Sequence, residues 1–268
     1  MQSSVGDQIR NWRQRRRLSQ LDLALEAEIS TRHLSFMETG RAQPSRDMVL
    51  RLAGCLEVPM RERNALLVAA GFAPVFSERN LDDPAMAAAR RAVERILEGH
   101  APYPAIAVDR AWNLVSANAA VALLMQVDDP VLLEPPVNVL RLSLHPRGVA
   151  PRVINYGEWR AHVLERLRRQ IEVSGDQGLV ELHDELAAYP APAPSLHRAP
   201  ASDFGGVAVP LLIETEAGVL SFISTITVFG TPVDITLSEL AIESFFPADA
   251  QTAETLRRLH PVSPARGS

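Results

Sequence analysis

Residues 19–38 form two short helices joined by a tight turn, and this segment constrains the fold more than any other part of the sequence. Ser19 and Ser30 are placed to cap the two helices, because a serine hydroxyl accepts hydrogen bonds from the exposed amides at a helix start. Leu34 and Met37 recur at a spacing that places them on one side of the second helix. The opposite side of that helix is polar, so we expect it to face outward.

Three further helices are predicted around this pair. An amphipathic helix with Ile9 and Trp12 on its apolar side comes first, and two more follow over residues 46–56 and 61–70. Gly40 follows the second helix of the pair, where a left-handed residue commonly ends a helix. Residues 1–72 are therefore predicted to form an all-α domain of five helices.

This arrangement, from about Val5 to about Ala70, resembles the Xre/Cro-type helix-turn-helix repressors. The resemblance implies a domain that binds double-stranded DNA, with the second helix of the pair in the major groove. Bases would then be read by residues early in that helix, and other polar residues would contact phosphates. The candidate DNA-binding residues are Gln20, Thr31, Arg32, His33, Ser35, Phe36, Thr39, Arg41 and Arg46.

Two residues of this region have alternative interpretations. Phe36 either contacts a thymine methyl group or is partly buried at the edge of the domain, as large apolar residues often are. Glu38 and Arg13 match a pair that in such repressors bridges the first helix to the end of the reading helix. We therefore interpret Glu38 as structural, the alternative being that it accepts a hydrogen bond from a cytosine.

The charge of the chain is divided unevenly along its length. The formal net charge of −5 alone would argue against a nucleic-acid partner. Residues 1–72, however, hold eleven arginines against eight acidic residues, a net charge of +3, and residues 73–268 carry −8. The cluster Arg13, Arg15, Arg16 and Arg17 either attracts the DNA backbone or interacts with the helix C-terminus.

Composition predicts a cytoplasmic protein. The chain has one cysteine, Cys55, which excludes an internal disulfide and suits a reducing compartment. Its N-terminus is polar, and no apolar run approaches the roughly 18 residues of a membrane helix. We therefore expect no signal peptide and no membrane partner.

After a linker and the start of a connecting helix over residues 73–90, the pattern changes to α+β. Five strands are expected in one antiparallel sheet with helices on one face, and a disordered tail is expected over 261–268. The predicted strands are 105–109, 112–116, 207–214, 219–229 and 234–244. The predicted helices are 85–98, 118–124, 137–142, 156–171, 178–188 and 249–259, and the proline-rich stretch 190–194 is predicted to be a loop.

This order of elements, with Val-Asp-Arg-Ala-Trp-Asn-Leu-Val-Ser-Ala-Asn at 108–118 and Asn-Val-Leu-Arg at 138–141, resembles the MmyB-like ligand-binding domain, a PAS-like module. The resemblance covers about residues 90–259, and we assign the domain to 91–260. It implies a pocket between sheet and helices for a lipophilic, fatty-acid-like small molecule. The candidate wall residues are Leu124, Trp159, Leu220, Phe222, Ser224 and Ile226, each of which could instead be ordinary core.

The sequence offers nothing that favours an enzyme. The acidic and histidine pairs around His162 and His183 lack a recognised metal-ligand spacing, and no phosphate-binding loop or nucleophile motif is present. We expect no catalytic residue, no metal and no cofactor apart from a bound lipophilic ligand. The chain is predicted to be a transcription regulator that binds a palindromic operator as a homodimer. Alternatively, its C-terminal domain serves only dimerisation or docking of a protein partner.

Overall fold

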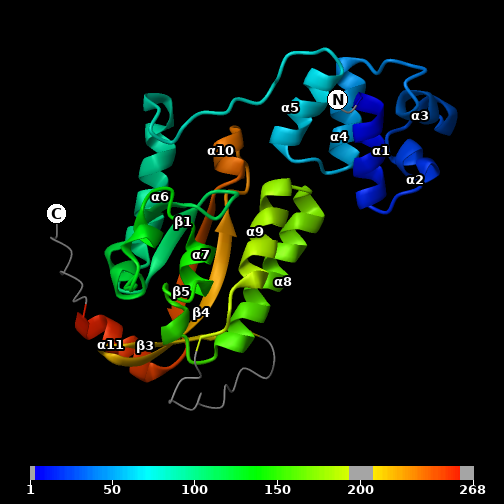
Figure 1. Ribbon diagram of the computed structural model, residues 1–268. Helices are drawn as coiled ribbons and strands as arrows, with labels where there is room; N and C mark the ends of the chain where they lie inside the picture. Colours follow the sequence, from blue (N-terminus) through cyan, green and yellow to red (C-terminus); the bar gives the residue numbers. More distant parts are fainter. Residues whose placement is uncertain (1–3, 193–207, 260–268) are drawn as a thin grey trace. The chain divides into compact units, whose positions relative to one another are not determined.

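The computed structural model describes residues 4–192 and 208–259 and divides into two compact units (Figure 1). One unit runs to Arg79 and also includes Glu172–Ser174 and Thr231–Ser238. The other contains Asn80–Ile171, Gly175–Gly230 and the chain from Glu239. The predicted tail 261–268 and the end of the predicted proline-rich loop lie outside the described residues.

The first unit contains the five predicted helices. They are α1 (Val5–Arg15), α2 (Gln20–Glu26), α3 (Thr31–Glu38), α4 (Arg46–Cys55) and α5 (Met60–Ala69). The predicted caps are confirmed, since Ser19 accepts from the amide of Asp22 and Ser30 accepts from the amide of His33. Gly40 has a φ of +72°, the left-handed conformation predicted for it.

The apolar stripes of these helices meet in one core, which includes Ile9, Leu34 and Met37. At Gly6 the backbones of α1 and α3 come together so closely that a Cβ atom would lie 2.4 Å from the carbonyl oxygen of Met37. Glycine is therefore required where α1 crosses the end of α3. This contact fixes α3 on the domain from behind, with its polar side outward.

The second unit is α+β, as predicted. Its strands are β1 (Ala105–Val108), β2 (Leu114–Ala117), β3 (Leu211–Thr215), β4 (Gly218–Val228) and β5 (Ala241–Pro247). Its longer helices are α6 (Ala87–Gly99), α7 (Val139–Leu144), α8 (Tyr156–Ser174), α9 (Gln177–Ala188) and α11 (Ala250–Leu259). Short 3-10 turns lie at Pro84–Met86, Ala119–Leu123, Pro130–Leu133 and Ala150–Arg152. The helix α10 (Ile235–Ser238), which precedes β5 in the chain, belongs to the first unit.

The strands form one antiparallel sheet in the order β2-β1-β5-β4-β3. One face packs against residues of α7, α8 and α9 in the largest apolar cluster of this unit. On the other face, Val93 and Leu97 of α6 pack against Ala107 and Ile242. The structure thus adds one helix on the face opposite to the predicted helical layer.

Three elements predicted from the sequence need correction. The helix predicted over 118–124 is a 3-10 turn over Ala119–Leu123, and the strand predicted over 207–214 begins at Leu211. The strand predicted over 234–244 begins only at Ala241. The reason is Asp234, whose buried carboxylate accepts hydrogen bonds from the Ser77 hydroxyl and from the amide of Thr236. The chain therefore forms the short helix α10 after Asp234 instead of a strand.

Candidate functional site

The first candidate site is the outward side of α3. Leu34 and Met37 are completely buried, so the helix is fixed by that side. Arg32 and His33 are exposed, and Thr31 and Ser35 are half-buried. Arg32 and His33 are thus the most exposed of the α3 residues that the sequence assigned to DNA.

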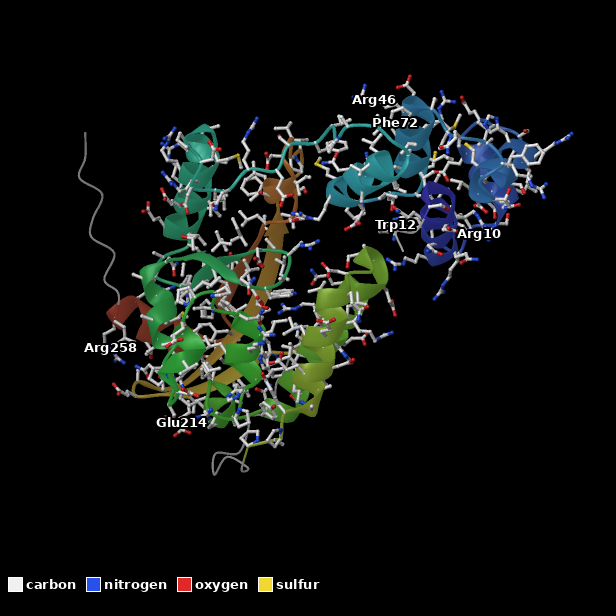
Figure 2. All side chains as sticks on the ribbon, turned by 45° about the horizontal axis from the view of Figure 1, so that its top comes forward. Arg10, Trp12, Arg46, Phe72, Glu214 and Arg258 are labelled. Atoms are coloured by element: carbon white, nitrogen blue, oxygen red, sulfur yellow. The ribbon has the colours of Figure 1, made fainter. Side chains whose placement is uncertain are left out.

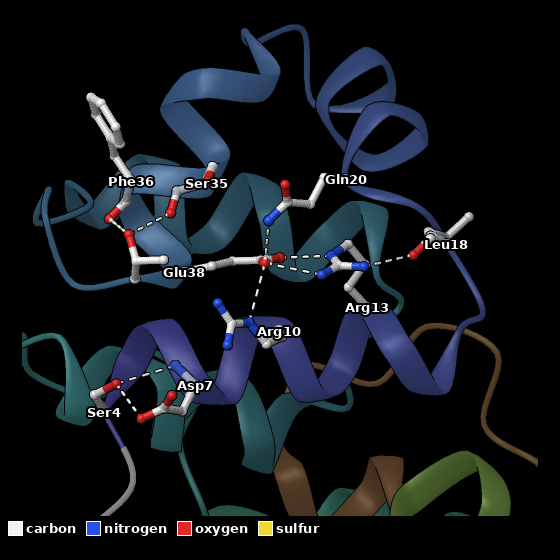
Figure 3. Close-up of polar contacts among 10 residues, drawn as sticks. Ser4, Asp7, Arg10, Arg13, Leu18, Gln20, Ser35, Phe36 and Glu38 are labelled. Atoms are coloured by element: carbon white, nitrogen blue, oxygen red, sulfur yellow. Dashed lines mark hydrogen bonds and ion pairs between the residues drawn. The ribbon is translucent and has the colours of Figure 1, made fainter.

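Phe36 lies between two guanidinium groups on this side of the helix. The carbon at the centre of the Arg32 guanidinium is 5.3 Å from the ring centroid, and that of Arg41 is 5.9 Å away. Such distances allow cation–π attraction, which holds long arginine side chains in place. Phe36 is half-buried, and Figure 3 shows its side chain pointing away from the polar network of Glu38. Aromatic and cationic groups thus form one surface.

Glu38 is the centre of a buried polar network (Figure 3). Arg13 donates to both carboxylate oxygens, at 2.6 and 3.0 Å, and Gln20 donates at 2.8 Å. Arg10 adds an ion pair at 3.5 Å. Burial opposes ionisation of Glu38, but the hydrogen bonds from Arg13 and Gln20 outweigh it and hold the pKa of this carboxyl below its ordinary value.

This network supports the structural interpretation of Glu38. Its side chain has no exposed surface, so the alternative of a contact with cytosine is wrong. Gln20 donates one amide hydrogen to Glu38, and its second amide hydrogen remains for the predicted phosphate contact. The network therefore ties the second half of α1 and the start of α2 to the end of α3.

The remaining basic and polar candidates surround α3. The Thr39 hydroxyl donates to the carbonyl of Ser35 at 2.7 Å, while Arg41 is exposed. Arg46, labelled in Figure 2, is exposed at the start of α4. In the predicted arginine cluster, Arg16 donates to carbonyls at the C-terminus of α4, so this residue is engaged in holding the helices together.

The second candidate site is a cavity inside the second unit. Its walls come from strands β1, β2, β3 and β5, from α7 and α8, and from the segment around Leu124. The cavity has a volume of about 80 Å³. Ligand pockets commonly enclose about 300–1,000 Å³, so this cavity is narrow.

The predicted wall residues divide into three groups. Leu124 and Trp159 line the cavity. Leu220 and Phe222 are buried on the face of the sheet that packs against α7, α8 and α9, but they do not line the cavity. Ser224 is half-buried.

Ile226 requires a correction, because 43 % of its surface is exposed. It lies opposite Glu243 in the sheet, so the alternation assigned it to the correct face. The end of β4 is nevertheless uncovered, since every residue from Thr225 to Val228 is exposed.

Sequence reasoning missed the polar groups of the cavity. Arg166 of α8 and Glu243 of β5 both line it and form an ion pair at 2.9 Å, and Ser143 accepts a hydrogen bond from the Trp159 indole at 2.9 Å. The sequence signal for this pair was the alternation of inward and outward side chains in β5, which places Glu243 on the inward side. A carboxylate on the inward side of an apolar strand needs a buried partner.

Two known families match this chain. Residues 89–259 match the MmyB-like transcription regulator ligand binding domain, and residues 9–63 match a helix-turn-helix family. The chain belongs to the MmyB-like transcription regulators. It is a DNA-binding transcription regulator with a C-terminal ligand-binding domain, and neither family is enzymatic. No curated protein matches the chain in sequence.

Two further observations concern the predicted absences. Among the helices of residues 4–192 and 208–259, none combines the length and the apolar character needed to cross a membrane. Within these same residues, no three histidine, cysteine, aspartate or glutamate side chains are grouped in a way that could hold a metal ion.

Proposed function

We propose that this MmyB-like regulator binds a palindromic operator as a homodimer and that a lipophilic small molecule in its C-terminal cavity changes the affinity for DNA. A helix-turn-helix dimer places two reading helices about one turn of DNA apart, so a two-fold operator matches a two-fold protein. The observation that carries the DNA part is the surface formed by Arg32 and Phe36 of α3 and by Arg41 of the loop that follows, because the other side of α3 is completely buried.

Within this surface, Arg32 is the residue we assign to base reading. An arginine donates two hydrogen bonds to O6 and N7 of guanine, which contributes about 1–3 kcal/mol of discrimination between bases. Phe36 supplies an apolar surface next to it for a thymine methyl group. Gln20, Thr39, Arg41 and Arg46 position the helix through phosphates, and such contacts do not select a sequence.

The ligand part rests on the apolar cavity between sheet and helices. The cavity is lined in part by Trp159, Leu124 and Phe245, with which an extended hydrocarbon chain would make apolar contacts. A ligand shifts the affinity for the operator only if it binds two protein conformations unequally. We therefore expect ligand binding and operator binding to be linked in the intact chain.

The DNA assignment is tested by selecting operators from random duplexes with the full chain and repeating the selection with Arg32→Ala. We expect the variant to lose more than about tenfold in operator affinity, since one bidentate contact is removed. Its folding should be unchanged, because Arg32 is exposed. Arg91→Ala, at an exposed position of α6, is the matched control and should bind as the wild type does. An unchanged sequence preference in Arg32→Ala would overturn the assignment.

Native mass spectrometry of the purified full chain tests the oligomer and the ligand together. We expect a dimer that carries a co-purifying lipophilic molecule. A dimer that neither carries nor takes up such a molecule would favour the alternative, in which the C-terminal domain serves only dimerisation or docking of a protein partner.

A further inference from the structure

The lining of the cavity includes an arginine–glutamate pair that is only partly satisfied. Arg166 donates through Nη1 to Glu243 at 2.9 Å, a single contact rather than a two-pronged one. The Nε of Arg166 is buried and has no hydrogen-bond partner among the described residues. Both side chains line the cavity. A buried donor without an acceptor is costly, so a ligand that supplies an acceptor here is favoured.

The surroundings hold Arg166 in a fixed position. Its guanidinium lies 4.3 Å from the ring centroid of Trp112, close enough for a strong cation–π contact. The indole of Trp112 in turn donates to Gln170 at 2.7 Å, which fixes the ring. Arg166 is therefore held by Trp112 and Glu243 before any ligand enters.

The charges of the residues that line the cavity are already balanced. Among the described residues that line the cavity, Arg166 and Glu243 are the charged ones, and their charges are opposite. Burial, together with the nearby positive charge of Arg166, lowers the pKa of His162, which is therefore neutral at pH 8. A ligand with an ionised carboxylate would add a second negative charge beside Glu243, where 3 % of the residue is exposed.

We propose that the cavity selects a neutral lipophile whose polar end both accepts and donates hydrogen bonds, such as a fatty primary amide, over the ionised fatty acid of the same length. The carbonyl oxygen would accept from Arg166, and the amide hydrogens would be donated to Glu243. An additional buried charge without a partner costs several kcal/mol, whereas a neutral amide adds none. This inference rests on the proposed ligand-binding function and specifies the ligand's chemical class.

The test compares octanamide with octanoate, two probes of equal length and similar shape that differ in charge at pH 8. Binding to the full chain is measured by isothermal titration calorimetry, with the fluorescence of Trp159 and Trp112 as a second signal. We expect wild-type protein to bind octanamide about tenfold or more tightly than octanoate, because octanoate brings an unbalanced charge.

A charge-neutral variant makes the same test sharper. Glu243→Gln keeps an acceptor for Arg166 but removes the negative charge. The positive charge of Arg166 is then no longer neutralised and can pair with the probe's carboxylate. The variant should bind octanoate about tenfold or more tightly than the wild type does. Glu181→Gln, at an exposed position of α9, is the matched control and should leave both affinities unchanged.

The outcomes separate the inference from the proposed function. If the wild-type chain binds octanoate as tightly as octanamide or more tightly, the inference is wrong and the ligand-binding function stands. If neither probe binds to the wild type, the ligand-binding function itself is wrong. The wild-type comparison decides between these results even if Glu243→Gln does not fold.

Discussion

The two units of this regulator each bury an arginine–glutamate pair, and the two pairs are satisfied to different degrees. In the DNA-binding unit, Glu38 receives two hydrogen bonds from Arg13 and one from Gln20, and its side chain has no exposed surface. In the ligand-binding unit, Glu243 receives one hydrogen bond from Arg166, which lines a cavity and whose Nε has no partner among residues 4–192 and 208–259.

This difference indicates where each unit performs its function. A fully satisfied network rigidifies the structure around it and leaves little for a ligand to bind, so we expect the first unit to recognise DNA through the outer surface of α3. A partly satisfied pair at a cavity wall leaves hydrogen-bonding capacity for a bound molecule. We therefore expect the second unit to recognise its ligand in its interior.

The largest effect is expected for Glu38→Ala. Removing one member of a fully buried pair leaves the other charge without compensation, which costs about 3–5 kcal/mol. Hydrogen-exchange mass spectrometry of the full chain should show faster exchange throughout α1–α5, because it reports the opening free energy region by region. Glu26→Ala, at an exposed position of α2, is the control and should change exchange little. Equal effects of the two variants would show that the network does not stabilise this unit.

A smaller loss is expected for Glu243→Ala. Arg166 keeps its contact with Trp112 and lines a cavity, so the loss of a single hydrogen bond between charged groups should cost about 1.5–3 kcal/mol. The same exchange measurement should localise the change to α8 and β5. A loss as large as that of Glu38→Ala would contradict the difference between the two pairs.

The pH dependence of stability follows from the same comparison. The pKa of Glu38 is lower in the folded protein than its ordinary value of 4.5, so its ionised form stabilises the fold above that pH. This stabilisation is lost as the pH falls through the lowered folded pKa. Thermal melting of wild type and Glu38→Gln should therefore differ most at pH 7 and progressively less below pH 4.5. A difference that stays constant down to pH 3 would show that ionisation of Glu38 does not contribute.

The smallest effect is expected for Arg46→Gln, on the surface. Losing one phosphate contact should weaken binding to operator and random duplexes alike and reduce the slope of log affinity against log salt by about 1. Fluorescence anisotropy at several salt concentrations measures both quantities. A change in sequence preference would instead assign Arg46 to base reading.

Local features of the first unit could be predicted from sequence because their causes lie within a few residues. Ser19 and Ser30 accept from amides three positions later, and Gly40 needs only its own φ angle. The bridge between Arg13 and Glu38 was available through the resemblance to Xre/Cro-type repressors. The close approach at Gly6 was missed, since it depends on a backbone more than 30 positions away.

The cavity was harder to predict because its parts are distant in sequence. Arg166 and Glu243 are 77 positions apart and meet only through the register of the sheet under α8. Alternation placed Ile226 on the correct face, but it carries no information about how far the helices cover a strand. Asp234 was read as part of a strand because its partner, Ser77, is 157 positions away.

The central claim is that the outer side of α3 reads a specific operator. The most direct measurement is the ratio of the dissociation constants of the full chain for a random duplex and for its selected operator at physiological salt. We predict a ratio of about a thousand or more, the range of sequence-specific DNA-binding proteins. A ratio near one, or no binding to either duplex, would contradict the account.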